Sequence, residues 1–189
     1  MTTLENDIVL LKPLTPEHFD VLLPISKQLD VYRYSPSDIS TDKKLKVYLQ
    51  AAIDLRSEGR AIPFLVHDKR TSEVAGCTRF GHIDHKNKVI HIGWTWIAPK
   101  FQGTGLNTNM KFLMLYYAFE ELMMEKVEFR IDERNTRSRK AVEKLGAKLE
   151  GVLRKSVVVK DGFRRNTCCY GMLREEWPRI KQKLMYQIA

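Results

Sequence analysis

Residues 90–120 read IHIGWTWIAPKFQGTGLNTNMKFLMLYYAFE, and this stretch decides the fold. Ile90–Ile97 is rich in β-branched and aromatic residues, which is typical of a buried strand. Pro99 cannot donate a ladder hydrogen bond, so it predicts the end of that strand. The QGTG sequence at 102–105 predicts a tight turn. Residues 106–124 are apolar on almost every side, which predicts a helix buried against a sheet.

The start of this predicted helix lacks the acidic residues that usually gather there. The first N–H groups of a helix are unpaired and the helix dipole is positive at that end, so Asp and Glu are favoured. Here no acidic residue occurs between Pro99 and Phe119. Two upstream glycines, Gly103 and Gly105, let backbone N–H groups converge without obstruction by Cβ atoms. The pattern favours a bound phosphate or pyrophosphate. The alternative is that the glycines only make a turn and Thr104 caps the helix.

Length and composition are those of an ordinary globular protein. The 189 residues, 43% hydrophobic and 29% charged, predict one domain over residues 1–189. Cys77, Cys168 and Cys169 lack metal-ligand spacing, so we expect reduced packing residues and no metal. The N-terminus lacks a secretion signal and no apolar run reaches membrane-span length, which indicates a cytoplasmic protein without a membrane partner. The net charge of +9 is spread along the chain, so a nucleic-acid partner is not expected.

The rest of the chain predicts an antiparallel meander that feeds the central strand, turn and helix. A parallel strand, a short helix, a hairpin and a final helix then follow. Strands are predicted at 7–12, 62–67, 74–83, 88–97, 126–132, 148–160 and 163–173, helices at 16–28, 42–58, 106–124, 135–145 and 175–185, and a loop at 32–40.

A second helix start is also unusual. Arg137, Arg139 and Lys140 lie in the first turns after Asn135, where the helix dipole disfavours cations. One interpretation is a solvated basic face. The other starts from the order of elements, because both unusual helices follow consecutive strands. If those strands are neighbours, both helix N-termini open into one crevice at the carboxyl edge of the sheet. A ligand that carries several phosphates fits such a crevice.

Several short motifs, in this order and at these spacings, resemble those of one enzyme superfamily. They are IGWTWI at 92–97, QGTGLN at 102–107, NTRS at 135–138, LGA at 145–147, EGVLR at 150–154, DG at 161–162 and EWP at 176–178. With them the chain resembles the GNAT acetyltransferases, and in particular the RimJ/RimL-like branch, named for enzymes that acetylate ribosomal-protein N-termini. The resemblance spans nearly the whole chain and is closest from Ile90 onward.

The resemblance implies a fold and a cofactor site. The fold is α/β (α+β), with a mixed, mostly antiparallel central sheet of about seven strands that splays between strands 4 and 5 and is flanked by helices. Acetyl-CoA, as co-substrate, sits in the split. The expected contacts are N–H groups of Gln102, Gly103, Thr104, Gly105, Leu106 and Asn107 with the pyrophosphate, main-chain groups of Trp96 and Ile97 with the pantetheine arm, Asn135 with the pantetheine, and Arg137 or Arg139 with a nucleotide phosphate.

The implied reaction is direct attack of a neutral amine on the thioester, which needs a base for the amine and an acid for the departing thiolate. Many superfamily members use a Tyr as that acid, but Val142 occupies the matching position here. Ser138 is the nearest donor, either to the cofactor sulfur or as an ordinary first-turn serine. His91 is the best titratable candidate for the base, with a structural histidine as the alternative. His82 and Asp84 are weaker candidates.

The expected activity is therefore an acetyl-CoA-dependent N-acetyltransferase that acts on a primary amine, either a peptide N-terminus or an amine-bearing small molecule. The rival interpretation is a non-catalytic module that binds CoA, or RNA on a ribosomal surface, through the same basic crevice. The sequence leaves open whether the protein forms a homodimer.

Overall fold

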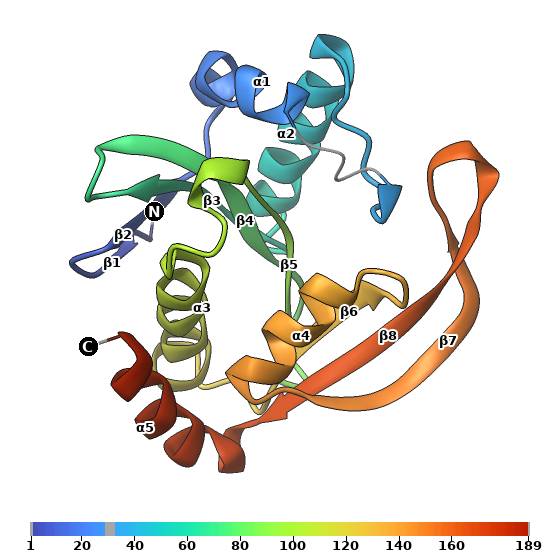
Figure 1. The fold of residues 1–189 in the computed structure, drawn as a ribbon. Coiled ribbons are helices and arrows are strands. Elements are labelled where there is room, and N and C mark those ends of the chain that lie inside the picture. The colour runs from blue at the N-terminus through green and yellow to red at the C-terminus, as the bar shows by residue number, and fades with distance from the viewer. Residues whose placement is uncertain (1, 29–32, 189) are drawn as a thin grey trace.

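The computed structural model describes residues 2–28 and 33–188. In these residues the chain forms one mixed sheet of eight strands, in the order β1-β2-β3-β4-β5-β6-β8-β7, flanked by five α-helices (Figure 1). The strands are β1 (Leu4–Glu5), β2 (Val9–Pro13), β3 (Ile62–Asp68), β4 (Glu73–Asp84), β5 (Val89–Ile97), β6 (Lys126–Asp132), β7 (Lys148–Val158) and β8 (Arg164–Leu173). The helices are α1 (Phe19–Lys27), α2 (Asp42–Ser57), α3 (Leu106–Tyr116), α4 (Thr136–Leu145) and α5 (Trp177–Ile188).

The sheet separates between β5 and β6, its only parallel pair among the described strands. The pairing covers just Val89–His91 of β5 and Lys126–Glu128 of β6. Beyond these residues the two strands diverge, so the carboxyl half of β5 has β4 on one side and no strand on the other. This confirms the predicted splay between the fourth and fifth predicted strands, at 88–97 and 126–132.

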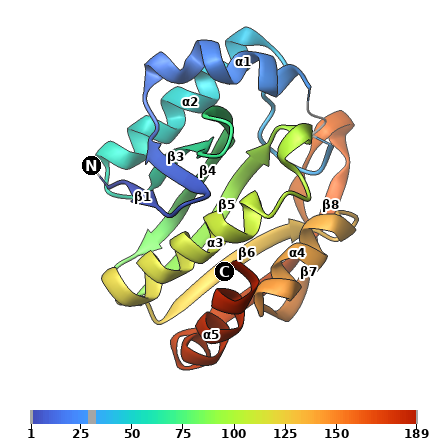
Figure 2. The ribbon, with the colours of Figure 1, turned by 60° about the vertical axis from the view of Figure 1, so that its left-hand side comes forward.

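The two faces of the sheet carry different helices. Helices α3, α4 and α5 lie on one face of the sheet (Figure 2). On this face Phe80 of β4 lies against Tyr117 just beyond α3, and Tyr170 of β8 contacts α4. On the other face, Tyr48 of α2 meets Cys77 of β4 and Trp96 of β5. The open split between β5 and β6 is therefore flanked by the N-termini of α3 and α4 on the first face.

Most predicted elements are confirmed, and the differences have local causes. The sheet has eight strands rather than about seven, because the two-residue β1 pairs with β2 and is too short to give a pattern. The predicted helix at 106–124 is α-helical only to Tyr116 and continues as a π-helical turn over Tyr117–Glu121. Of the predicted loop at 32–40, Tyr32 lies outside the described residues, and 33–40 form neither α-helix nor strand. Among the described helices none is both long and apolar enough to cross a membrane.

Candidate functional site

The N-terminus of α3 is bare of side-chain caps. Gly105 is its N-cap residue in the left-handed region with φ of 85°, and no acidic residue lies in the first turn. A Cβ atom at Gly103 or Gly105 would meet nothing within 4 Å, so the space in front of the turn is open. The alternative cap, Thr104, instead donates its hydroxyl to the carbonyl of Phe101 at 2.8 Å. The first N–H groups of α3 are therefore left for an anion.

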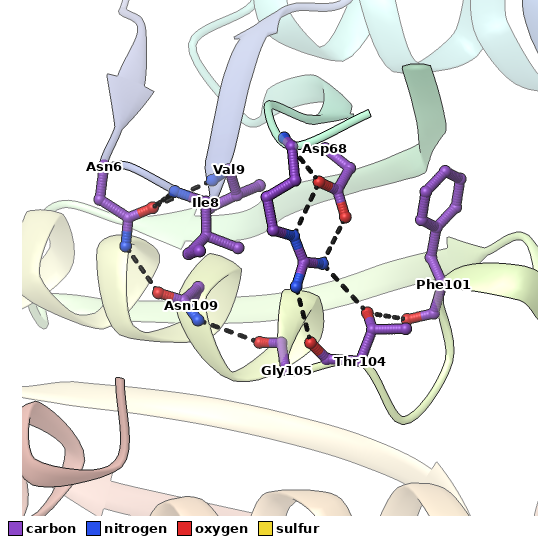
Figure 3. Close-up of polar contacts among 9 residues, drawn as sticks. Asn6, Ile8, Val9, Asp68, Phe101, Thr104, Gly105 and Asn109 are labelled. Carbon is purple, nitrogen blue, oxygen red and sulfur yellow. Dashed lines mark hydrogen bonds and ion pairs between the residues drawn. The ribbon is translucent and has the colours of Figure 1, made fainter. Parts of the chain in front are cut away.

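Polar contacts from the β1–β2 and β3–β4 connections and from α3 hold this turn in place (Figure 3). The guanidinium of Arg70, just after β3, donates to the Thr104 carbonyl at 3.1 Å and to its hydroxyl at 3.3 Å. Asp68 accepts from the same guanidinium, and this hydrogen bond lowers the pKa of the carboxyl. On the other side, Asn109 donates to the Gly105 carbonyl and accepts from Asn6 at 2.8 Å. The turn is thus fixed before any ligand binds, which reduces the entropy cost of binding.

The N-terminus of α4 lies beside that of α3. Arg137 in the first turn of α4 donates to the side-chain oxygen of Gln102 in the α3 turn at 2.5 Å. The Gln102 amide in turn donates to the Ile97 carbonyl at the end of β5 at 2.9 Å. The first turn of α4 contains no acidic residue, and Asn135 caps it by accepting from the Ser138 N–H at 3.1 Å. Two positive helix ends therefore flank one end of the split, as the sequence predicted.

The remaining predicted cofactor residues differ in which of their groups are free to contact a ligand. Main-chain groups of Trp96 and Ile97 pair with β4 on one side, and β6 does not reach them on the other. The Leu106 side chain is buried in the core, which leaves only its main chain for a ligand, while Asn107 is half-buried. Arg139 donates to the Tyr170 hydroxyl at 3.0 Å and to the Glu133 carbonyl at 3.1 Å, so Arg137 is the better placed of the two arginines.

Comparisons with known proteins agree with this geometry. The family model for the acetyltransferase (GNAT) domain matches residues 9–148. The chain belongs to the GNAT acetyltransferase family. The "Uncharacterized N-acetyltransferase p20" of Bacillus licheniformis is 29% identical over 155 residues, which cover 82% of this chain and 86% of that protein.

Solved structures extend the likeness to the whole fold. The crystal structure of a GCN5-related N-acetyltransferase from Brucella melitensis has a TM-score of 0.90 and 30% identity, and the match covers 100% of this chain and 86% of that one. Mycobacterium smegmatis RimJ in complex with CoA-disulfide has a TM-score of 0.84 at 21% identity, covering 98% and 93% of the two chains. The second likeness concerns the fold alone.

A GNAT acetyltransferase domain needs groups that move protons, and His91 suits that task poorly. The His91 side chain is 6% exposed and packs against the rings of His82 and Trp94. Burial, with nearby positive groups, lowers its pKa to about 3. A base with so low a pKa is a weak proton acceptor at neutral pH, so the geometry favours a neutral hydrogen-bonding role. Its Nδ1 is buried without a hydrogen-bond partner in the described structure.

The other catalytic candidates lie on different elements, with Ser138 on α4 and His82 and Asp84 at the end of β4. Ser138 is half-buried in the first turn of α4, at the same helix end as Arg137. Val142 of α4 is buried and has no hydroxyl, so it cannot act as the acid. His82 is exposed and its pKa is lowered by desolvation and by nearby cations, while Asp84 accepts from Asn87 in the β4–β5 turn.

Sequence reasoning missed three buried cations, which are Lys111, Arg79 and Arg165. Lys111 of α3 is 5% exposed and its Nζ donates to the hydroxyl of Thr95 on β5 at 2.7 Å. Arg79 of β4 is 4% exposed and lies between the rings of Tyr48 and Trp94. A signal for Lys111 existed, because it is the only charged residue between Phe101 and Phe119 in an otherwise apolar helix. The sequence around Arg79 contains no such signal, since alternation along a strand does not distinguish a buried arginine from an exposed one.

Proposed function

We propose that this protein is an acetyl-CoA-dependent N-acetyltransferase that moves an acetyl group from the CoA thioester to a primary amine by direct attack. Membership of the GNAT family gives the reaction class. The observation that carries the proposal is the contact between Arg137 and Gln102, because it joins two positive helix ends without acidic residues in their first turns at one end of the split. A diphosphate is the ligand that suits such a pair.

In this proposal the cofactor is held mainly by the main chain. N–H groups of the turn at 102–107 receive the pyrophosphate, and Arg137 adds a charge-assisted contact to a phosphate. The unpaired edge of β5 at Trp96 and Ile97 pairs with the pantetheine arm as a neighbouring strand would. Asn135 lies beside the same arm, and the Ser138 hydroxyl donates a hydrogen bond to the sulfur as it becomes a thiolate.

The acceptor approaches the thioester from the opposite face of the sheet. The α3, α4 and α5 side of the split is occupied by the helices that hold the cofactor, whereas α2 covers only part of the other face. A peptide N-terminus or a small amine fits this approach. The amine must be neutral to attack, so the rate is expected to rise with pH toward the pKa of the acceptor amine.

The first experiment measures cofactor binding by thermal shift with acetyl-CoA. Ligand at 100 times its Kd stabilises a protein by about 2.7 kcal/mol. Gly105→Glu places a carboxylate in front of the N–H groups of α3 and is expected to abolish the shift. Gly162→Glu is the matched control, because Gly162 also has a positive φ and open space around its Cβ position but lies in the β7–β8 turn. Equal shifts in wild type and Gly105→Glu would remove the cofactor assignment.

The second experiment separates an enzyme from a binding module. Thiol release is followed with acetyl-CoA and a panel of peptides and small amines, and mass spectrometry identifies the acetylated product. We expect release of CoA that depends on the amine. A protein that binds acetyl-CoA but transfers acetyl to no amine in the panel would be the non-catalytic CoA-binding module instead.

A further inference from the structure

Arg79 carries a buried charge with no opposite charge beside it. Its guanidinium lies 4.7 Å from the ring centroids of both Tyr48 and Trp94, and its side chain is 4% exposed. Among the residues that the structure describes, no carboxylate forms an ion pair with it. Two aromatic faces offset part of the cost of burying a guanidinium, but an unpaired charge away from water remains unfavourable.

A second buried arginine, Arg165 of β8, lies across the split. It is 7% exposed, and its guanidinium donates to the Thr167 hydroxyl at 3.2 Å and to the Tyr34 carbonyl at 2.6 Å. Both of these acceptors are neutral. No carboxylate within the described parts of the chain forms an ion pair with Arg165 either. The charge of Asp132 acts on Arg165, but Asp132 already pairs with Arg134, so neither buried arginine has a carboxylate of its own among the described residues.

Both arginines are on the face of the sheet that α2 partly covers. Arg79 is opposite Gly93 in the β4–β5 register, and His91, two residues earlier, shares that face. In the parallel register His91 is beside Glu128 of β6. Asp132 is four residues further along β6 and therefore points to the same face as Glu128. Asp132 is opposite Thr167, and Arg165 lies two residues from Thr167 on β8. This is the face opposite to the helix ends assigned to the cofactor.

His91 lies between the two arginines and has a polar atom to satisfy. Its Nδ1 is buried with no partner in the described structure. The charged neighbours that act on it are His82, Arg130, Lys111 and Arg165, all of them positive or neutral bases. The carboxylates on this face already have basic partners, since Glu128 and Glu150 pair with Lys126, and Asp132 pairs with Arg134 and also acts on Arg165. The centre of this face is therefore positive, and His91 has an unused hydrogen-bonding site in it.

We infer that the amine acceptor of this enzyme carries a carboxylate close to its amine, and that Arg79 and Arg165 are specificity-determining residues that select it. The inference rests on the proposed acetyl transfer and deepens it. A carboxylate near the split would neutralise the two buried guanidinium groups in a low-dielectric setting, where charge pairs are strong. His91 Nδ1 offers the same acceptor a hydrogen bond.

Such a carboxylate has two sources, a free amino acid or an acidic residue at a peptide N-terminus. The experiment compares pairs that differ in this charge, with kcat/KM referred to the concentration of neutral amine, because the carboxylate of alanine also raises the pKa of its amine. One arm measures kcat/KM for alanine against alaninamide, and the other for an amidated peptide that begins with Asp against one that begins with Asn. We expect at least a tenfold preference for the charged member in one arm, which also identifies the source. Equal or better transfer to the neutral member in both arms would overturn the inference, while the acetyl transfer itself would still support the proposed function.

Variants test the two arginines. Arg79→Met and Arg165→Met are each expected to lower kcat/KM for the charged acceptor by about 10- to 100-fold, the range for losing a charged hydrogen bond, and to change the neutral acceptor by less than about 3-fold. Arg164→Met is the control, because Arg164 is exposed and is the strand neighbour of Arg165. An equal loss for both members of a pair would mean that the arginines support the fold and do not select the acceptor.

A binding measurement keeps the inference testable if no transfer is seen. Calorimetry on the CoA-saturated wild-type protein compares the Asp and Asn peptides, and alanine with alaninamide. Tighter binding of the charged member without turnover would support a carboxylate-binding site and rule out the proposed activity. Equal binding in both pairs would remove the anionic site, whatever the activity.

Discussion

Lys111→Met is expected to make this protein more stable below neutral pH. Lys111 points from α3 into the core, where Nζ donates to the hydroxyls of Thr95 at 2.7 Å and Thr78 at 3.4 Å. Among the described residues it has no carboxylate partner, and burial lowers its pKa from 10.5 to about 7. Met has a similar length and no charge, so it fills the same space without the desolvation cost.

The magnitude follows from the two pKa values. The unfolded chain holds the lysine proton up to about pH 10.5, whereas the folded chain releases it near pH 7, so stability rises with pH between these values. One pKa unit is worth about 1.4 kcal/mol, which makes the protonated lysine cost about 5 kcal/mol below pH 7. Two hydrogen bonds of about 1 kcal/mol each offset part of that cost. The Thr78 and Thr95 hydroxyls keep their mutual bond at 2.7 Å in the variant.

We therefore expect Lys111→Met to raise the free energy of unfolding by about 2–3 kcal/mol at pH 6 and to give little gain at pH 9. Urea unfolding at pH 6, 7.5 and 9 measures this, with Lys43→Met at an exposed position of α2 as the control. A variant that is less stable than wild type at pH 6, or a gain that does not change with pH, would refute the reasoning. The first result would mean that the hydrogen bonds of Lys111 outweigh the cost of its burial.

Two further predictions concern the frame of the cofactor site. Asp68→Asn is expected to lower the free energy of unfolding by about 1–3 kcal/mol at pH 7, because it weakens the charged hydrogen bonds to Arg70. Arg70 lowers the pKa of Asp68, so the stability advantage of the wild type should fade as pH falls below about 4. Acid unfolding curves of the two proteins measure this. Gly76→Ala would place a Cβ atom 2.0 Å from the Trp96 carbonyl oxygen. It is expected to cost more than about 3 kcal/mol in urea unfolding, against about 1 kcal/mol for Gly103→Ala, where the space is open, and similar costs for both would contradict the close approach of β4 and β5.

Much of the candidate site was predictable because it depends on local chemistry. A turn with two glycines followed by a helix without acidic residues already indicates an anion at Gly105, and the structure shows that helix end uncapped. The parallel order of β5 and β6 followed from the strand–helix–strand pattern, so the proximity of the two helix ends could be inferred as well. The contact between Arg137 and Gln102 shows that the two helix ends are close together.

The acid–base assignments were less predictable because burial depends on distant parts of the chain. His91 looked like the best base on the central strand, but its ring is enclosed by His82 and Trp94, and burial with nearby cations moves its pKa to about 3. Which of Arg137 and Arg139 lies beside the α3 turn was equally open. Tyr170, 31 residues further along the chain than Arg139, binds that arginine.

The sequence by itself determined the strand, turn and helix at 90–120 and the lack of acidic residues at two helix ends, because these depend on residues that act over a few positions. The family followed from the order and spacing of short motifs. Only the tertiary structure decided that Arg79, Arg165 and His91 are buried on one face of the sheet, and that Lys111 is enclosed in the core. Desolvation and the pairing of charges are set by neighbours that approach only when β4, β5, β6 and β8 assemble, so no short stretch of sequence contains them.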